Sequence, residues 1–254
     1  MRAVGFGAVL AVLAGISTAQ AQNVEFDAAL NYAARDEILQ PGDHDKSDND
    51  IFRLAMALSW DALGDGRMRA ALELGVRNED FDGHYPAVNG FELAFGRRVG
   101  MQRYAAGARF RAADDLSTTT ELAYSAEHFG RSIDWHGLFG AQFIADSDDV
   151  PGRDGPGLFG QVDGDFYIND NWLLMAGALA DTDGAVYGFG TEYRFGDAPV
   201  SLFLDYAEAF DDYRGQRNYD SLSVGIRLIP KAKSLRSFHQ SNLSRAMFRL
   251  VEVQ

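Results

Sequence analysis

The feature that most constrains this chain is a repeated alternation of apolar and polar residues, broken about every ten residues by polar segments rich in Gly or Asp. Between positions 24 and 33, every second residue belongs to the apolar set Val24, Phe26, Ala28, Leu30 and Tyr32. The same alternation recurs between Phe52 and Trp60. A period of two places successive side chains on opposite faces of a β-strand. Each strand is therefore expected to have one apolar face and one polar or charged face.

The alternation predicts an all-β fold of about twelve strands, with ten to fourteen possible because strand ends are hard to place from sequence. The predicted strands are 24–34, 51–60, 67–76, 90–97, 101–111, 119–128, 133–144, 158–168, 171–180, 185–195, 199–210 and 218–229. Their connections alternate in length, since 35–50 and 145–157 are long whereas 98–100 and 169–170 are short. Bacterial membrane barrels sort their connections in this way, with short turns on the periplasmic side and longer loops outside. We therefore expect an antiparallel up-and-down transmembrane β-barrel.

The direction in which the apolar face points determines whether the sheet lies in a membrane or in water. Strands of this length with one apolar face suit a tilted path across a bilayer. Hydrocarbon tolerates no open sheet edge, so a membrane sheet of this kind has to close on itself. The alternation is also compatible with a secreted, soluble β-barrel or sandwich that turns its apolar face inward and binds a ligand. The number of strands and the sorted connections favour the membrane barrel.

The first 21 residues predict export of the chain. Met1 and Arg2 form a short basic start, residues 4–16 are apolar, and Ala19-Gln20-Ala21 has the small-x-small pattern of a cleavage site. This pattern is typical of a secretory signal peptide rather than of a retained anchor helix. No later segment has 18 consecutive apolar residues, so we expect no helical membrane span. The expected organisation is a signal peptide at 1–21, a barrel at 22–229 and a basic tail at 230–254.

Charge and cysteine content exclude several classes of function. The net charge is −14, although the tail at 230–254 holds five basic residues and a single acidic one. The remainder of the chain is therefore strongly acidic, which argues against nucleic acid as a partner. The absence of cysteine excludes a disulfide framework and thiolate chemistry.

Aromatic residues give a further indication of a membrane protein. Those that fall near the ends of predicted strands are Tyr32, Trp60, Tyr104, Phe129, Trp135, Phe166, Trp172, Tyr193, Phe195, Tyr206 and Tyr219. Membrane barrels carry girdles of aromatic side chains at the two bilayer interfaces. Strands are generally rich in aromatic residues as well, so this placement alone does not distinguish the two explanations.

Over residues 22–229 the chain resembles the porin-like outer-membrane β-barrel proteins of Gram-negative bacteria in its pattern of strands, connections and aromatic residues. The resemblance implies location in the outer membrane, contact with outer-membrane lipid and lipopolysaccharide, and insertion by the barrel assembly machinery. The chain departs from the family at its end. Barrels of this kind commonly finish on an aromatic residue that the assembly machinery reads, whereas here the last predicted strand is followed by Pro230 and the basic tail.

If the apolar residues face lipid, the opposite faces of the strands line the lumen. A charged side chain facing lipid at mid-depth would cost about 2–4 kcal/mol for Arg, so this assignment is energetically constrained. The expected lumen-lining charges are Arg53, Arg67, Arg69, Glu73, Glu92, Arg103, Arg109, Arg111, Glu121, Asp134, Asp163, Asp165 and Arg227. Arginines gather on the second to fifth strands and carboxylates on the sixth to eighth, which predicts a transverse field that can select polar solutes.

This lumen predicts a porin-like channel for passive diffusion of small hydrophilic solutes. The alternative is a plugged structural or adhesive barrel in which the same charges neutralise one another. Barrels of about eight strands are filled by side chains and those of about 16–18 hold water channels, so twelve strands leave both alternatives open. Neither function requires a cofactor, a metal ion or catalytic residues, and we expect none.

One short motif was tested as a catalytic site. His239-Gln240-Ser241-Asn242 resembles the His-x-Ser-Asn motif of outer-membrane phospholipase A, a twelve-stranded barrel enzyme. The resemblance implies that His239 would act as the base for a Ser241 nucleophile. Leu243 stands where that family has glycine, and neither a third orienting group nor an oxyanion site is identifiable. We therefore predict that the protein is not an enzyme.

Two other segments remain open. The acidic loops Asp43-His44-Asp45 and Asp146-Ser147-Asp148-Asp149 could bind a divalent cation that bridges to lipopolysaccharide, although neither has EF-hand spacing. Such runs are more often solvated loop surface. In the tail, the apolar residues Leu243, Met247, Leu250 and Val251 share one helical face. A short interfacial helix, a periplasmic arm contacting the acidic body and plain disorder are comparable alternatives for the tail.

Overall fold

The computed structural model describes residues 24–38, 46–79, 83–85, 88–113, 118–145, 155–182, 184–210, 219–230, 233–241 and 243. The strands are β1 (Glu25–Ile38), β2 (Lys46–Ala62), β3 (Gly66–Glu79), β4 (Gly83–Tyr85), β5 (Val88–Val99), β6 (Gln102–Ala113), β7 (Thr118–Phe129), β8 (Ile133–Ala145), β9 (Gly155–Asn169), β10 (Trp172–Asp181), β11 (Ala185–Arg194), β12 (Val200–Phe210) and β13 (Tyr219–Leu228). A 3₁₀ turn, η1 (Leu63–Asp65), joins β2 to β3, and a helix, α2 (Leu235–Ser241), follows β13.

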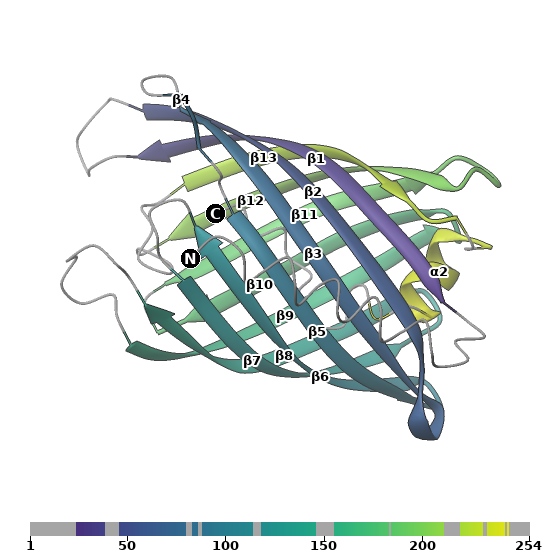
Figure 1. The fold of residues 1–254 in the computed structure, drawn as a ribbon. Helices are drawn as coiled ribbons and strands as arrows, with labels where there is room; N and C mark the ends of the chain where they lie inside the picture. The colour runs from purple at the N-terminus through teal and green to yellow at the C-terminus, as the bar shows by residue number, and fades with distance from the viewer. Residues whose placement is uncertain are drawn as a thin grey trace.

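Twelve of these strands form a closed antiparallel barrel (Figure 1). Each strand pairs with its neighbours along the chain, and β1 pairs with both β2 and β13, which closes the ring. The short strand β4 lies outside the ring and pairs with the end of β3, where Arg77 is opposite Tyr85. The predicted twelve-stranded barrel is therefore confirmed, and β4 is an addition within a connection that the alternation had marked as a loop.

The closing pair is as long as an ordinary neighbouring pair. The register of β1 against β13 runs from Ala28 opposite Leu228 to Glu37 opposite Tyr219. Because each strand has a partner on both sides, the barrel has no long free edge that would expose unpaired backbone groups.

The short turns gather at the end of the barrel where β1 begins. At the β2–β3 turn, Gly64 and Asp65 adopt φ angles of 69° and 60°. This left-handed region suits glycine and is tolerated by Asp, which explains Gly64 and Asp65 at the turn. The β7–β8, β9–β10 and β11–β12 turns, which face α2, are at the same end. Bacterial membrane barrels have their short turns on the periplasmic side, so we expect this end to face the periplasm.

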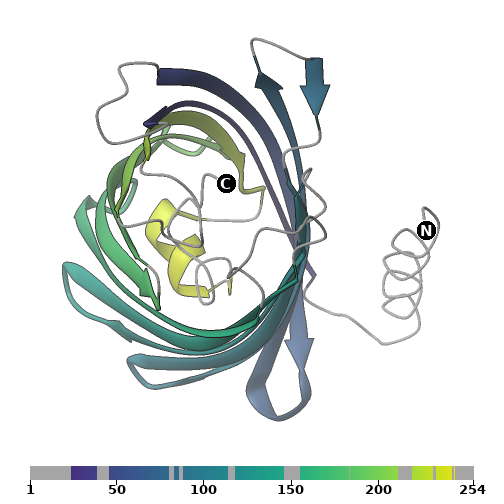
Figure 2. The same cartoon turned by 90° about the vertical axis from the view of Figure 1, so that its left-hand side faces the viewer.

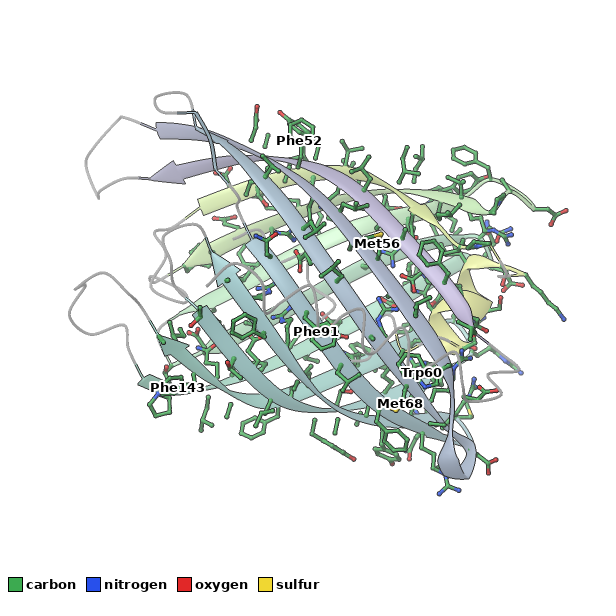
Figure 3. All side chains as sticks on the ribbon, in the orientation of Figure 1. Phe52, Met56, Trp60, Met68, Phe91 and Phe143 are labelled. Atoms are coloured by element: carbon green, nitrogen blue, oxygen red, sulfur yellow. The ribbon has the colours of Figure 1, made fainter. Side chains whose placement is uncertain are left out.

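The two faces of the sheet differ as the alternation predicts. On β7, exposed and buried side chains alternate from Thr120 to Phe129. Leu122 and Phe139 project outward and are each 62% exposed, whereas Glu121 is completely buried. Figure 3 shows other outward side chains, including Phe52 and Phe143. The exposed apolar residues are distributed all around the barrel, so the outer surface is an apolar belt.

The aromatic residues near strand ends mostly belong to this belt, including Tyr104, Trp135 and Trp172. Phe129 is different: only 3% of it is exposed, and its ring lies inside the barrel beneath the guanidinium groups of Arg98 and Arg103. Phe129 is therefore not part of the belt, although it lies near a strand end as the girdle aromatics do. The reason is parity, because the odd-numbered residues of β7 face inward and nearness to a strand end does not change the face.

After β13 the chain turns back into the barrel. Figure 2 shows the ring of strands around α2, which lies inside the end where the short turns are. Of the alternatives considered for the tail, contact with the barrel body is the one observed for residues 233–241 and 243; Met247, Leu250 and Val251 lie outside the described residues. Within the part of the chain that the structure describes, no helix has the length and apolar character needed to span a membrane.

We expect Leu122→Arg to lower the free energy of unfolding in phospholipid vesicles by about 2–4 kcal/mol, because it places a charge in the middle of the apolar belt. Met101→Arg is the control, since Met101 is also exposed, at 54%, but lies in a turn at the barrel end. There the cost should be about 0–1 kcal/mol. Urea titration of the vesicle-embedded protein measures both values. Equal costs at the two positions would contradict contact between the belt and hydrocarbon.

Candidate functional site

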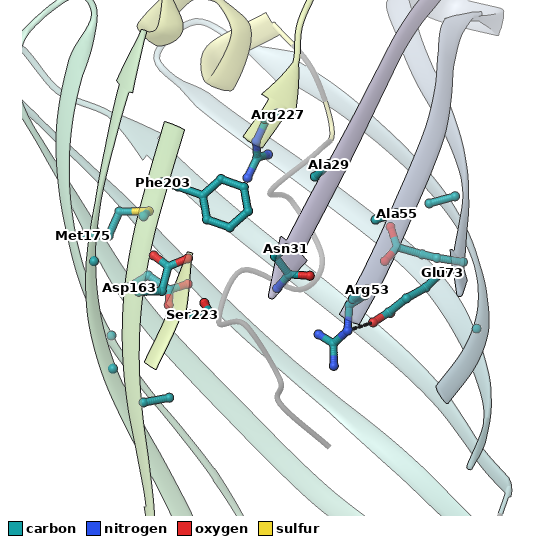
Figure 4. Close-up of a pocket in the computed structure, with 18 of the residues that line it drawn as sticks. Ala29, Asn31, Arg53, Ala55, Glu73, Asp163, Met175, Phe203, Ser223 and Arg227 are labelled. Atoms are coloured by element: carbon teal, nitrogen blue, oxygen red, sulfur yellow. Dashed lines mark ion pairs between the residues drawn. The ribbon is translucent and has the colours of Figure 1, made fainter. Parts of the chain in front are cut away.

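The candidate site is a cavity of about 230 Å³ inside the barrel. Its lining comes from β1, β2, β3, β5 and β6 on one side and from β9 to β13 on the other. Figure 4 shows the two sides facing each other, with Arg53 and Glu73 on one and Asp163 and Phe203 on the other. Because strands from opposite sides of the ring share one hollow, the cavity lies across the lumen.

An arginine pair shares one carboxylate on the first side of the cavity. Arg53 Nε lies 2.7 Å from Glu73 Oε1, and Arg111 NH2 lies 3.7 Å from Glu73 Oε2. Arg111 reaches Glu73 across β5, where the residue between them in register is Gly90. A Cβ added at Gly90 would lie 3.3 Å from the Arg111 side chain, so the glycine leaves room for this contact.

A second charged row crosses β5, β6 and β7. Arg109 lies in register between Glu92 and Glu121, and its Nε donates to Glu121 Oε2 at 2.5 Å. Nearby, Arg69 NH1 donates to Asp27 Oδ2 at 2.7 Å. Direct cross-strand placement of opposite charges stabilises antiparallel sheets. These arginines are therefore held against the wall by ion pairs.

The facing side of the cavity is acidic. On this side, β9 and β12 contribute Asp163, Asp165 and Asp205 to the lining, and Arg227 of β13 is the one cation among the described lining residues of this side. Asp163 Oδ2 lies 2.7 Å from His136 Nδ1. His136 is on β8 and is buried inside the barrel.

Glycines determine how two of these carboxylates lie. Gly177 is directly opposite Asp163 on the paired strand, and Gly190 is directly opposite Asp205. A Cβ at Gly177 would come within 2.3 Å of Asp163 Oδ1, and one at Gly190 within 2.0 Å of Asp205 Oδ1. The carboxylates therefore lie flat over the glycines and leave the centre of the cavity open.

Nine of the thirteen charged residues expected in the lumen line this cavity, namely Arg53, Arg69, Glu73, Glu92, Arg109, Arg111, Asp163, Asp165 and Arg227. The other four also lie on the inner side of the sheet but make contacts elsewhere. Arg67 pairs with Glu25 at 3.1 Å near the barrel end, and Glu121 is covered by Arg109. Arg103 and Asp134 contact α2.

The expected separation of charge into two sectors holds only in part. The arginine side also carries Asp27, Glu73 and Glu92, which pair with its arginines, so the field on that side is largely local. Glu121 and Glu127, which were expected to form the acidic sector, are instead paired with Arg109 and Arg103 across the β6–β7 register. The physical reason is that adjacent strands lie close enough for direct pairing, which is stronger than a field across the lumen.

The proposed catalytic pair does not form. His239 is buried and its Nε2 lies 3.3 Å from Glu192 Oε2, whereas Ser241 is exposed and its hydroxyl donates to the Phe238 carbonyl at 3.4 Å. Residues two positions apart on a helix do not face each other. Both residues lie within α2.

The acidic loop residues Asp43, His44, Asp45 and 146–149, considered for a divalent cation, lie outside the described residues. Asp50, which follows the first loop, is in β2 and accepts a hydrogen bond from the Tyr32 hydroxyl at 2.7 Å. The cation site therefore stays a prediction.

Sequence reasoning missed two parts of the site. The inner-face glycines Gly177 and Gly190 were not identified, because pairing register is needed to see which residues they face. The entry of α2 into the barrel was missed as well. The available signal was the set of apolar residues in the basic tail, of which Leu235, Phe238 and Leu243 are buried.

Comparison with known proteins identifies the fold. No known protein family and no curated protein sequence matches the chain. Among solved structures, an outer membrane channel from Pseudomonas putida F1 is 10% identical with a TM-score of 0.60, over 81% of this chain and 95% of that one. The porin NanC is 10% identical with a TM-score of 0.55, over 79% and 98%. The monoaromatic hydrocarbon channel CymD is 7% identical with a TM-score of 0.51, over 83% and 89%. The chain thus shares the barrel fold of these proteins.

We expect Arg109→Met to lower the free energy of unfolding by about 3–5 kcal/mol, because it leaves the buried Glu121 carboxylate without its guanidinium partner. The double variant Arg109→Met/Glu121→Gln should cost less than the sum of the two single variants, since the residues are in direct contact. Denaturant titration measures each value. Arg131→Met, at an exposed turn, is the control and should change stability by about 0.5 kcal/mol or less. Additive costs at Arg109 and Glu121 would contradict the pairing.

Proposed function

We propose that this protein is a porin-like channel of the outer membrane, through which small hydrophilic solutes diffuse passively. The observation that carries the proposal is the combination of an apolar outer belt with a charged cavity inside a closed barrel. The structurally similar proteins described above are named as channels or porins, which supports the same use of the fold.

The lining suggests how solutes pass. A polar solute that leaves bulk water exchanges part of its hydration for contacts with charged side chains in a pore. Arg53 and Arg111 offer donors on one side of the cavity, and Asp165 and Asp205 offer acceptors on the other. Because ion pairs and glycines hold several of these groups against the wall, the charges line the path without filling it.

The proposal includes the surroundings of the barrel. The apolar belt contacts membrane lipid, and small polar solutes occupy the lumen. Lipopolysaccharide is proposed as a contact of the external end, and the barrel assembly machinery as the partner in insertion. We propose that the assembly machinery recognises β13, because this strand is the last of the twelve and pairs with β1 to close the ring.

A closed structural barrel is the second candidate. It is favoured by α2, which occupies one end of the lumen, and by the ion pairs on the arginine side. The two candidates differ in a single measurable property, which is ion flow through the purified protein in a planar lipid bilayer. We expect discrete conductance steps, and a silent bilayer at every applied voltage would contradict the channel.

The lining charges should set the ion preference of the channel. Asp165→Asn/Asp205→Asn removes two carboxylates from the cavity, so we expect the reversal potential in a salt gradient to shift toward anion preference. Arg53→Gln/Arg111→Gln should shift it in the opposite direction. Glu208→Gln is the control, because Glu208 bonds the Tyr206 and Tyr187 hydroxyls and is absent from the lining. Equal reversal potentials for all variants would exclude this cavity as the ion path.

A further inference from the structure

We propose that residues 233–241, together with Leu243, form a seated plug, which narrows the lumen at the end with the short turns and limits flow through the channel. The inference rests on the proposed channel function and concerns its control. The helix α2 lies within the ring of strands (Figure 2), where hydrogen bonds and apolar contacts with the barrel hold it.

The start of the plug is held by groups from the turns of the barrel. Arg194 NH1 donates to the Lys233 carbonyl at 2.6 Å. The Leu235 amide donates to Asn171 Oδ1 at 3.2 Å, and the Arg236 amide donates to the Asp170 carbonyl at 3.0 Å. Amides in the first turn of a helix have no partner within the helix, so the β9–β10 turn satisfies two of them.

The end of the plug is held from another part of the ring. Arg103 donates to the carbonyls of His239 and Gln240 at 3.2 and 3.3 Å. Gln240 Nε2 donates to Asp134 Oδ2 at 3.0 Å. Carbonyls in the last turn of a helix also need outside partners, which Arg103 provides. The helix therefore bridges from the β9–β10 turn to β6 and β8.

Polar contacts from the same helix reach two further places. Arg236 NH2 donates to the carbonyls of Gly130 and Arg131 at 2.8 Å each, which ties the plug to the β7–β8 turn. His239 Nε2 lies 3.3 Å from Glu192 Oε2 on β11. Contacts with several strands around the ring are what a closing element requires.

Apolar sockets in the wall receive both ends of the plug. Leu235 and Phe238 pack with Tyr167, Leu173 and Ile229. Leu243, which is 1% exposed, packs in a separate cluster with Ala94, Ala105, Ala123, Leu138 and Phe159.

Gly96 on β5 completes the second socket. A Cβ added at Gly96 would lie 2.5 Å from Leu243 Cδ2, which is too close for any real contact. The wall therefore has a slot at this position that a larger residue would fill.

The plug can leave without breaking the barrel. Strand pairing closes the ring through β1 and β13 and includes no residue of α2. A helix of seven residues is not stable by itself in water, so its structure depends on the seat. A hollow of about 210 Å³ remains beside α2, lined in part by Glu25, Lys233 and Ser237. The plug thus narrows this end and is an element with seated and released states.

The test uses full-length variants that release the plug in two independent ways. Leu235→Asp/Leu243→Asp places charges in both apolar sockets, and Gly96→Val fills the slot from the wall side. Gly137→Val is the matched control, since it faces outward from β8 and its added Cβ meets no atom within 4 Å. Heat-modifiable mobility on a denaturing gel verifies that each barrel is folded.

Single-channel conductance in planar bilayers is the first measurement. Both releasing variants should conduct about twofold more than the parent, because the narrow section limits flow, and Gly137→Val should match the parent. Conductance equal to that of the parent in both releasing variants would overturn the plug.

Thiol labelling is the second measurement and needs no ion flow. The chain has no cysteine, so Ala105→Cys introduces a single thiol beneath Leu243. Its reaction with a polar maleimide should be about tenfold faster in the Leu235→Asp/Leu243→Asp background, since the rate follows the population with an open socket. Unchanged labelling would overturn the seated plug. Faster labelling with silent bilayers for the parent and every variant would instead overturn the channel, and with it control of flow by the plug.

Discussion

The pairing of β1 with β13 closes the sheet into a ring and so determines which face of every strand is inside. Without it the sheet would have two long edges of unpaired amides and carbonyls, and hydrocarbon would satisfy neither. The register from Ala28 opposite Leu228 to Glu37 opposite Tyr219 closes the ring along most of both strands. Closure also fixes the two faces, because a slip of one residue would exchange inner and outer side chains throughout a strand.

Once the ring is closed, the inner face has to accommodate many charges in a small space. Direct cross-strand ion pairs neutralise many of these charges, as between Arg109 and Glu121. Glycine provides space for others, since Gly177 and Gly190 have no side chain and let Asp163 and Asp205 lie against the wall. An unpaired buried charge would be costly, so the pairs stabilise the barrel, and a cavity of about 230 Å³ remains between them.

Local periodicity predicted the strands and their faces because a period of two is a property of each strand by itself. It did not predict which side chains meet, because that depends on register between strands, as the pairing of Glu121 with Arg109 shows. Phe129 lies near a strand end as the girdle aromatics do, but its parity on β7 places it inside the barrel. For the tail, the sequence indicated an apolar helical face that includes Leu243. The socket that receives Leu243 is formed by residues of β5 to β9. It cannot be predicted from the sequence of any single strand.

In the proposed arrangement, lipid covers the outer face of the sheet and water occupies its inside. Spin labels at single cysteines test it most directly, since the chain has none of its own. In vesicles, labels at Leu122 and Phe139 should be relaxed by oxygen, which concentrates in hydrocarbon. Labels at Ala55 and Ala71, which line the cavity, should be relaxed by a water-soluble nickel complex. The reverse pattern, with water at Leu122 and oxygen at Ala71, would contradict the account.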